Sequence, residues 1–121
     1  MRYDVVIIGA GAAGFACALT LGSANDKFDW AKDKKYLILD DNKSDLNVGK
    51  YFNVAGVDSG INGVDLLLKM KKQLEIYKDV ELKDEKATKI ENLGEYFKIT
   101  TQNSTYEASI VVLATGLHKF D

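Results

Sequence analysis

The alternation of apolar and polar residues divides the chain into short predicted elements. Residues 3–8 form a β-branched, largely apolar segment, as expected for a strand buried on both faces of a parallel sheet. Gly9 ends this strand, and residues 11–21 supply the alanines and other good helix formers of a predicted helix. Gly22 stands where a helix C-cap is expected, so we predict that the helix stops there.

A polar segment then separates this helix from the next strand. Residues 23–35 hold few apolar side chains and predict a loop or a short helix. Residues 36–39 return to strand character and end on Asp40 and Asp41. The strand, helix and second strand together favour an α/β fold.

A second helix is predicted over residues 62–78. Its apolar side chains recur three and four positions apart, at 64, 67, 70, 74 and 77, which defines one helical face. Asn62 with Asp65 three positions later resembles a capping box. Three lysines fall mostly off the apolar stripe and predict a solvated face, with a phosphate or nucleic-acid patch as the alternative: Lys69, Lys71 and Lys72.

From residue 80 the pattern changes to short strands separated by the turn-forming sequences "ENLGE" and "QNS". We expect a small antiparallel meander built from residues 80–82, 87–90, 96–101 and 105–108. The final run, "SIVVLA" at 109–114, is continuously apolar and is therefore expected to rejoin the parallel sheet. No proline, repeat or low-complexity segment marks a domain boundary, so residues 1–121 are expected to form a single domain.

Length and composition narrow the classes of function. A chain of 121 residues with 46% hydrophobic and 28% charged residues suits one globular domain. Its net charge of −2 argues against nucleic acid or an anionic membrane as the main partner. The apolar runs are too short for a bilayer span and the N-terminus lacks a signal-peptide pattern, so we expect a cytoplasmic protein. A single cysteine, Cys17, and a single histidine, His118, predict neither a disulfide nor a metal site.

A glycine motif carries the strongest chemical signal. Gly9, Gly11 and Gly14 form G-x-G-x-x-G between the first strand and the first helix. Gly9 permits a sharp exit from the strand, Gly11 lets a pyrophosphate approach the backbone, and Gly14 lets the helix pack close to the sheet. The helix N-terminus, at Ala12 and Ala13, presents unpaired N–H groups to phosphates. The alternative is a tight turn without a ligand.

A dinucleotide site also requires an acid at the end of the second strand, about 20 residues beyond the motif, to accept hydrogen bonds from a ribose. Asp40 lies somewhat farther from Gly14 than this, and the polar insertion at 23–35 accounts for the excess. We expect Asp40 to bind the ribose, with Asp41 as its substitute and a solvated strand end as the alternative. A carboxylate there repels a 2′-phosphate, which disfavours NADP without separating NAD from FAD.

The chain resembles the FAD-binding half of the two-dinucleotide-domain flavoproteins, the pyridine nucleotide-disulfide oxidoreductases, and is most similar to thioredoxin-reductase-like proteins. The resemblance covers nearly the whole chain and is carried by "VVIIGAGAAGFACALTLG" (5–22), "LILDD" (37–41), "KYFNVAGVDSGINGVDLLLKMKKQLEIY" (50–77) and the closing "SIVVLATG" (109–116). It implies a Rossmann-like α/β domain that binds FAD, with NAD less favoured, and that has a parallel sheet, helices and a small antiparallel meander.

The resemblance also implies roles for particular residues. The three glycines of the motif face the FAD pyrophosphate and Asp40 faces the adenosine ribose. Asn53 matches a position beside the isoalloxazine ring, with a simple turn-forming asparagine as the alternative. Ala87 matches a position whose backbone contacts the adenine, and Thr115 and Gly116 close the site near the nucleotide.

Some family features are missing from the sequence. Residues 40–52, "DDNKSDLNVGKYF", contain no glutamine, whereas related reductases carry a Gly-Gln-type element there that contacts the flavin. The family's nicotinamide-nucleotide domain, its redox-active cysteine pair and its later Gly-Asp motif would all lie beyond residue 121. We therefore expect a fragment or minimal form that is not a complete disulfide reductase on its own.

Three functions are consistent with these features. The first is an FAD-binding, thioredoxin-reductase-like oxidoreductase domain in which the flavin does the electron chemistry. The second is a non-catalytic module that binds ADP-like ligands, and the third is a domain that needs a second copy or a partner chain to complete its sheet. No catalytic residue is assigned: Cys17 on the Ala-rich helix is expected to be a core residue, and His118 an exposed one rather than a proton donor.

Overall fold

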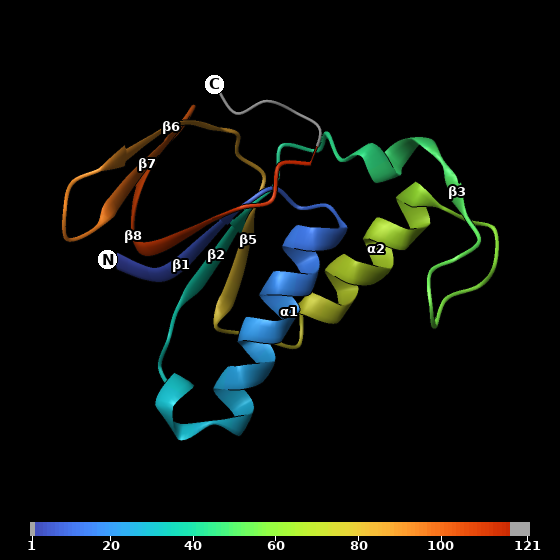
Figure 1. Cartoon of the computed structure of the whole chain (residues 1–121), viewed down its shortest axis with the longest axis horizontal. Helices are drawn as coiled ribbons and strands as arrows, with labels where there is room; N and C mark the ends of the chain where they lie inside the picture. The colour runs from blue at the N-terminus through green and yellow to red at the C-terminus, as the bar shows by residue number, and fades with distance from the viewer. Residues whose placement is uncertain (1, 117–121) are drawn as a thin grey trace.

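The computed structural model describes residues 2–116 and contains a six-stranded sheet with two α-helices on one face (Figure 1). Two short 3₁₀ helices, η1 and η2, follow α1 and β2. In chain order the elements are β1 (Arg2–Ile8), α1 (Ala12–Lys27), η1 (Asp29–Ala31), β2 (Tyr36–Leu39), η2 (Asp45–Val48), β3 (Lys50–Tyr51), β4 (Ile61–Asn62), α2 (Gly63–Leu74), β5 (Val80–Lys83), β6 (Ala87–Asn92), β7 (Phe97–Thr101) and β8 (Thr105–Leu113).

The sheet joins a parallel half and an antiparallel half. The strand order is β5-β2-β1-β8-β7-β6, in which β5, β2, β1 and β8 run parallel and β7 and β6 are antiparallel. Strand β8 connects the halves: its first residues pair with β7, from Thr105 to Ala108, and it pairs with β1 as far as Leu113. A separate two-stranded ribbon, β3-β4, lies beyond α2.

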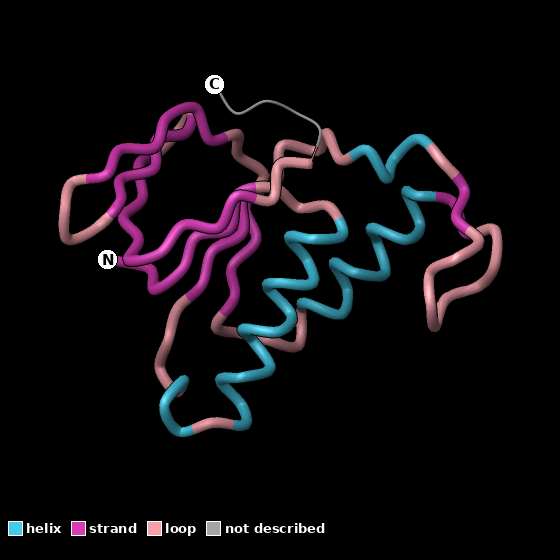
Figure 2. Tube along the Cα trace, in the orientation of Figure 1, coloured by secondary structure: helices cyan, strands magenta, loops and turns pink. Residues whose placement is uncertain are grey.

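A hydrophobic core lies on each face of the sheet. On one face Val5, Ile7 and Ile38 pack against Phe15 and Ala18 of α1, and α2 contributes to the same core. Figure 2 shows the two helices lying together on that side of the strands, and they contact one another. On the other face Val6 and Leu37 pack under the meander with Ile99 and Ala108. The alternation of side chains along β1 and β2 thus supplies both cores, which confirms the predicted α/β fold with a parallel sheet and an antiparallel meander.

The first helix is longer than predicted. It continues through Gly22 and ends at Lys27, so the prediction that Gly22 stops the helix was wrong. A Cβ at Gly22 would lie 2.8 Å from the Cβ of Tyr77, and this glycine therefore serves the close approach of α1 to the end of the α2 region. The remainder of the predicted loop at 23–35 contains η1.

The second helix begins where predicted and ends earlier. The Asn62 side chain accepts a hydrogen bond from the Asp65 N–H at 2.9 Å, so the predicted capping contact is confirmed. The helix ends at Leu74 rather than residue 78. Its buried face includes Leu66, which the predicted stripe omitted, while Val64 is exposed. The start of the apolar stripe was therefore misplaced, because Gly63 and Leu66, not Val64, face the protein interior.

Two strand assignments also differ from the prediction. Residues 80–82 belong to β5, which pairs parallel with β2 and is not part of the meander. Residues 105–108 and 109–114 were predicted as separate strands, whereas Thr105–Leu113 form the single strand β8. The expected return of the final apolar run to the parallel sheet is confirmed by its pairing with β1.

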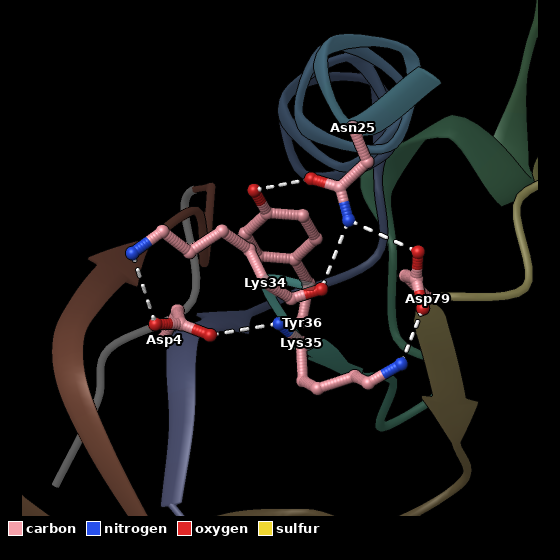
Figure 3. A network of polar contacts seen from close by, with 6 residues as sticks. All are labelled: Asp4, Asn25, Lys34, Lys35, Tyr36 and Asp79. Atoms are coloured by element: carbon pink, nitrogen blue, oxygen red, sulfur yellow. Dashed lines mark hydrogen bonds and ion pairs between the residues drawn. The ribbon is translucent and has the colours of Figure 1, made fainter. Parts of the chain in front are cut away.

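A polar network centred on the buried Asn25 lies at the end of the sheet opposite the glycine motif (Figure 3). Asn25 of α1 is buried, and its Oδ1 accepts a hydrogen bond from the Tyr36 hydroxyl at 2.9 Å. Its Nδ2 donates to the Lys34 carbonyl at 2.9 Å and to the Asp79 carboxylate at 3.1 Å. Asp79 also pairs with the Lys35 ammonium at 2.5 Å. The network ties the C-terminal end of α1 to the starts of β2 and β5.

Candidate functional site

A cleft of about 670 Å³ lies where the carboxyl ends of β1, β2 and β8 meet the first turn of α1. Figure 1 shows these strand ends next to the start of α1. Its volume lies within the usual range of small-molecule pockets, and the carboxyl ends of parallel strands are where open α/β sheets bind ligands. The cleft is lined by residues 8–13, 43–46, 85–88 and 113–116, together with Leu39, Asp41 and Tyr51. Four separate segments thus converge on one site.

The glycine motif forms the floor of this cleft by close backbone packing. Gly9 has φ +109°, a conformation that favours glycine, and a Cβ there would lie 2.1 Å from the Ala114 carbonyl oxygen. A Cβ at Gly14 would lie 1.9 Å from the Gly9 carbonyl oxygen. Neither position can hold a larger residue without moving the backbone. Both observations agree with the structural roles predicted for these two glycines.

The N-terminus of α1 faces the cleft without a side-chain cap. Gly11 is the N-cap residue, no side chain bonds to the first turn, and that turn contains no acidic residue. Ala12 and Ala13 line the cleft and carry only methyl groups. The N–H groups of the first turn and the positive end of the helix dipole are therefore available to an anion. The Ser44 side chain lies next to Gly11: a Cβ added at Gly11 would be 2.9 Å from the Ser44 Oγ.

The two candidate ribose acids lie in different environments. Asp40 is only 7% exposed and lines a separate pocket of about 230 Å³ beside α2, rather than the main cleft. Burial raises the pKa of Asp40, while the Asn42 N–H, which donates to it at 2.7 Å, opposes this shift. Asp41 lines the main cleft, and its Oδ1 accepts a hydrogen bond from the Lys43 N–H at 3.1 Å. Of the two carboxylates, Asp41 is the one placed in the main cleft.

The remaining predicted residues divide between the cleft and the rest of the surface. Ala87, Thr115 and Gly116 line the cleft, so the structure brings them together with the glycine motif. Gly14 packs against the Gly9 carbonyl beneath the cleft and is not one of the residues that line it. Asn53 is exposed on the segment after β3 and lies outside the residues that line the cleft. Its predicted flavin contact stays a prediction.

Sequence reasoning missed two lining segments, residues 43–46 and 85–88 apart from Ala87. The first is held by η2, where the Ser44 Oγ accepts a hydrogen bond from the Leu46 N–H at 3.2 Å. A serine followed by an aspartate is a common helix start and could have indicated this element. Tyr51 adds a hydrogen bond from its hydroxyl to the Leu46 carbonyl at 3.2 Å. The second segment gives no comparable local signal.

The other chemical candidates do not add a site. Cys17 is partly buried against the helix-side core, and burial raises the pKa of its thiol, which disfavours the reactive thiolate. His118 lies outside the described residues. Within residues 2–116, no group of His, Cys, Asp and Glu side chains is arranged to hold a metal ion. No helix in the same range is long and apolar enough to cross a bilayer.

Comparison with known proteins agrees with this geometry. The family model for pyridine nucleotide-disulphide oxidoreductases matches residues 3–121. Thioredoxin reductase from Treponema pallidum is 32% identical over 114 residues, which cover 94% of this chain and 35% of that protein. The crystal structure of thioredoxin reductase from Streptococcus pyogenes is 33% identical, has a TM-score of 0.81, and covers 95% of this chain and 35% of that chain.

A thioredoxin reductase structure from Gloeobacter violaceus is 28% identical with a TM-score of 0.82, and the match covers 95% of this chain and 37% of that one. The chain therefore spans about a third of the length of these relatives. The similarity reaches the parallel sheet, the glycine motif and the meander alike, since the matched range includes nearly every residue.

Proposed function

Because this chain belongs to the pyridine nucleotide-disulphide oxidoreductase family, we propose that it is an FAD-binding, thioredoxin-reductase-like oxidoreductase domain. The observation that carries the proposal is the uncapped N-terminus of α1 at the floor of a cleft that also contains the 85–88 and 113–116 segments. A dinucleotide needs an anion site for its diphosphate and surfaces that hold the nucleoside at either side of it. The α1 N-terminus could serve as the anion site, and the two other segments could serve as these surfaces.

The diphosphate would bind at Gly11, Ala12 and Ala13. Gly11 leaves space next to the amides, and the helix dipole stabilises negative charge there. Ser44 would assist, because its hydroxyl oxygen already accepts the Leu46 N–H and its own hydrogen remains available to a phosphate oxygen. Lys43 also lines the cleft and adds positive charge to it.

The adenosine would lie between Asp41 and residues 85–88. Asp41 carries the carboxylate that lines the cleft, and we propose it in place of Asp40 as the principal acceptor for the ribose hydroxyls. Ala87 and its neighbours would offer backbone groups to the adenine, and Thr115 and Gly116, which also line the cleft, would close the site near the nucleotide. A negative charge beside the ribose disfavours NADP, and the family likeness favours FAD over NAD.

Bound FAD would supply the two-electron chemistry that no side chain in the cleft can perform. The chain's own residues would bind and orient it. Cys17 is the only cysteine in residues 1–121, so these residues contain no dithiol pair, and reduction of a disulfide substrate would need thiols from outside them. We propose that residues 1–121 act as one FAD/NAD(P)-binding domain, expected in the cytoplasm, and that the electron donor and acceptor bind other protein segments.

The exposed edge of β8, at residues 109–113, supports pairing with a strand from another protein segment. Among the described strands, residues 109–113 pair only with β1, and Ile110 and Leu113 are 55% and 61% exposed. A free parallel edge with apolar side chains favours addition of a strand. A second copy or a partner chain would complete the sheet there. Sedimentation of the I110D variant, which should stay monomeric if the wild type associates, tests this contact.

Reconstitution with FAD tests the proposed function. The protein is unfolded, refolded with excess FAD and passed through a desalting column, and its absorption spectrum is recorded. Retention of the flavin bands with the protein, and a rise in melting temperature with FAD, are expected. A colourless protein whose melting temperature rises with ADP would indicate the non-catalytic nucleotide-binding module instead. A protein that responds to neither ligand would contradict both.

A further inference from the structure

The link between β5 and β6 forms one wall of the cleft. β5 and β6 are the two outermost strands of the sheet, and residues 84–86 carry the chain from one to the other. This crossing is possible because the meander curls over the face of the sheet opposite the helices. In the wall at 85–88, Ala87 and Thr88 belong to β6, where Ala87 pairs with Thr101 of β7. The attachment of the link to the meander therefore decides where the other two residues, 85 and 86, lie.

Glu85 makes that attachment with both carboxylate oxygens. The Thr101 hydroxyl of β7 donates to its Oε1 at 2.6 Å, and the Tyr106 hydroxyl of β8 donates to its Oε2 at 2.5 Å. The hydrogen bond from Thr101, and after it the one from Tyr106, lowers the pKa of Glu85, so this carboxylate stays ionised. Hydrogen bonds to an ionised acceptor are about twice as strong as neutral ones.

The two hydroxyl groups are themselves held in place. Thr101 is 5% exposed, and its Oγ1 also accepts hydrogen bonds from the N–H groups of Asn103 and Ser104 at 3.2 and 3.0 Å. The Tyr106 ring packs edge-on against Tyr3 of β1, with the ring centroids 6.2 Å apart. Glu85 is therefore bonded to two rigid points, and the link cannot move without breaking one of them.

We propose that Glu85 is a positioning residue for nucleotide binding, whose carboxylate holds the link side of the 85–88 wall, residues 85 and 86, at the distance from the glycine motif that an adenosine group requires. The inference rests on the proposed function and goes beyond it, because it assigns the two halves of the ligand to different supports. The diphosphate is held by the N-terminus of α1, which has no bond to Glu85. The adenosine depends on the wall whose link side Glu85 fixes.

Calorimetric titration with two probes, ADP and inorganic pyrophosphate, separates these supports. Replacing Glu85 by alanine should weaken ADP binding about tenfold, since a charge-assisted anchor is lost, and leave pyrophosphate binding unchanged. Y106F should also weaken ADP, because it removes one anchor while keeping the ring against Tyr3. E85Q should stay within about threefold of wild type, because an amide can still bond both hydroxyls. E91A is the matched control, since Glu91 pairs with Lys89 at 3.8 Å outside the cleft.

Each outcome decides the proposal. If E85A weakens ADP while Y106F does not, Glu85 touches the nucleotide directly and the positioning role is wrong. If E85A weakens ADP and pyrophosphate equally, the residue supports the whole fold and not the adenosine wall. If E85A binds ADP as tightly as wild type, the inference alone fails. Wild-type protein that binds neither probe would overturn the proposed function, and the inference with it.

Discussion

Replacing Gly11 by alanine tests where the diphosphate binds. Gly11 has φ −95°, which any residue can adopt, so the added methyl group causes no backbone strain. The nearest atom to that methyl group is the Ser44 Oγ at 2.9 Å, which belongs to a side chain that can rotate. The substitution therefore changes the space in front of the helix amides far more than it changes the fold.

The expected magnitudes follow from these contacts. Alanine is a poorer N-cap than glycine, and with the displaced Ser44 hydroxyl we expect G11A to lower the free energy of unfolding by about 1 kcal/mol. A methyl group between a diphosphate and the amides of Ala12 and Ala13 removes charge-assisted hydrogen bonds. ADP affinity should fall at least about tenfold. Urea unfolding measures the first quantity and calorimetric titration with ADP the second.

G14A is the matched comparison, because the same atom is added one helical turn away. A Cβ at Gly14 would lie 1.9 Å from the Gly9 carbonyl oxygen, which is backbone and cannot rotate away. Overpacking should cost about 2 kcal/mol even after the better helix propensity of alanine is counted. G11A should thus lose more binding and G14A more stability. If G11A binds ADP as tightly as wild type, the diphosphate does not lie where we place it.

The network in Figure 3 supplies the remaining predictions. N25A should lower the free energy of unfolding in urea by about 3 kcal/mol, because it leaves the buried Tyr36 hydroxyl without its partner; a loss below about 0.5 kcal/mol would contradict this. K35M should lower the free energy of unfolding by less than about 1 kcal/mol, since Lys35 and its partner Asp79 are partly exposed to solvent, and a larger loss would show that the pair is stronger than its exposure indicates. The hydrogen bond from the Lys35 ammonium, and after it the one from the Asn25 amide, lowers the pKa of Asp79 in the folded protein below its value in the unfolded chain. The stability that the ionised Asp79 contributes is therefore present above about pH 4 and is lost in acid. The difference in unfolding free energy between wild type and D79N should shrink below that pH, and a difference that persists would refute the assignment.

Local sequence signals were reliable where one residue determines one contact. Gly9 and Gly14 could be interpreted from their spacing because no side chain fits against the backbone at either position. The Asn62 cap was also predictable, since its side chain bonds a residue three positions away. Gly22 shows the limit of such signals. A glycine that ends a helix and a glycine that lets a helix approach a neighbour are identical in sequence, and only the position of Tyr77 separates them.

The part of the candidate site that local sequence signals determine could be predicted. Gly9, Gly11 and Ala87 were found from the motif and the family resemblance, and all three line the cleft. The choice between Asp40 and Asp41 depends on the side to which each carboxylate turns after β2: Asp40 lines the pocket beside α2 and Asp41 lines the main cleft. Glu85 could not be found from the sequence, because its partners Thr101 and Tyr106 lie far along the chain.

We place the diphosphate of a dinucleotide at the N-terminus of α1. The most direct test is an amide-resolved NMR titration of the ¹⁵N-labelled protein with ADP. We predict that the largest shift changes occur at the N–H groups of Ala12 and Ala13, with smaller ones at Ala87 and Thr88. Shift changes confined to residues outside the cleft, or no saturable change at millimolar ADP, would contradict the account.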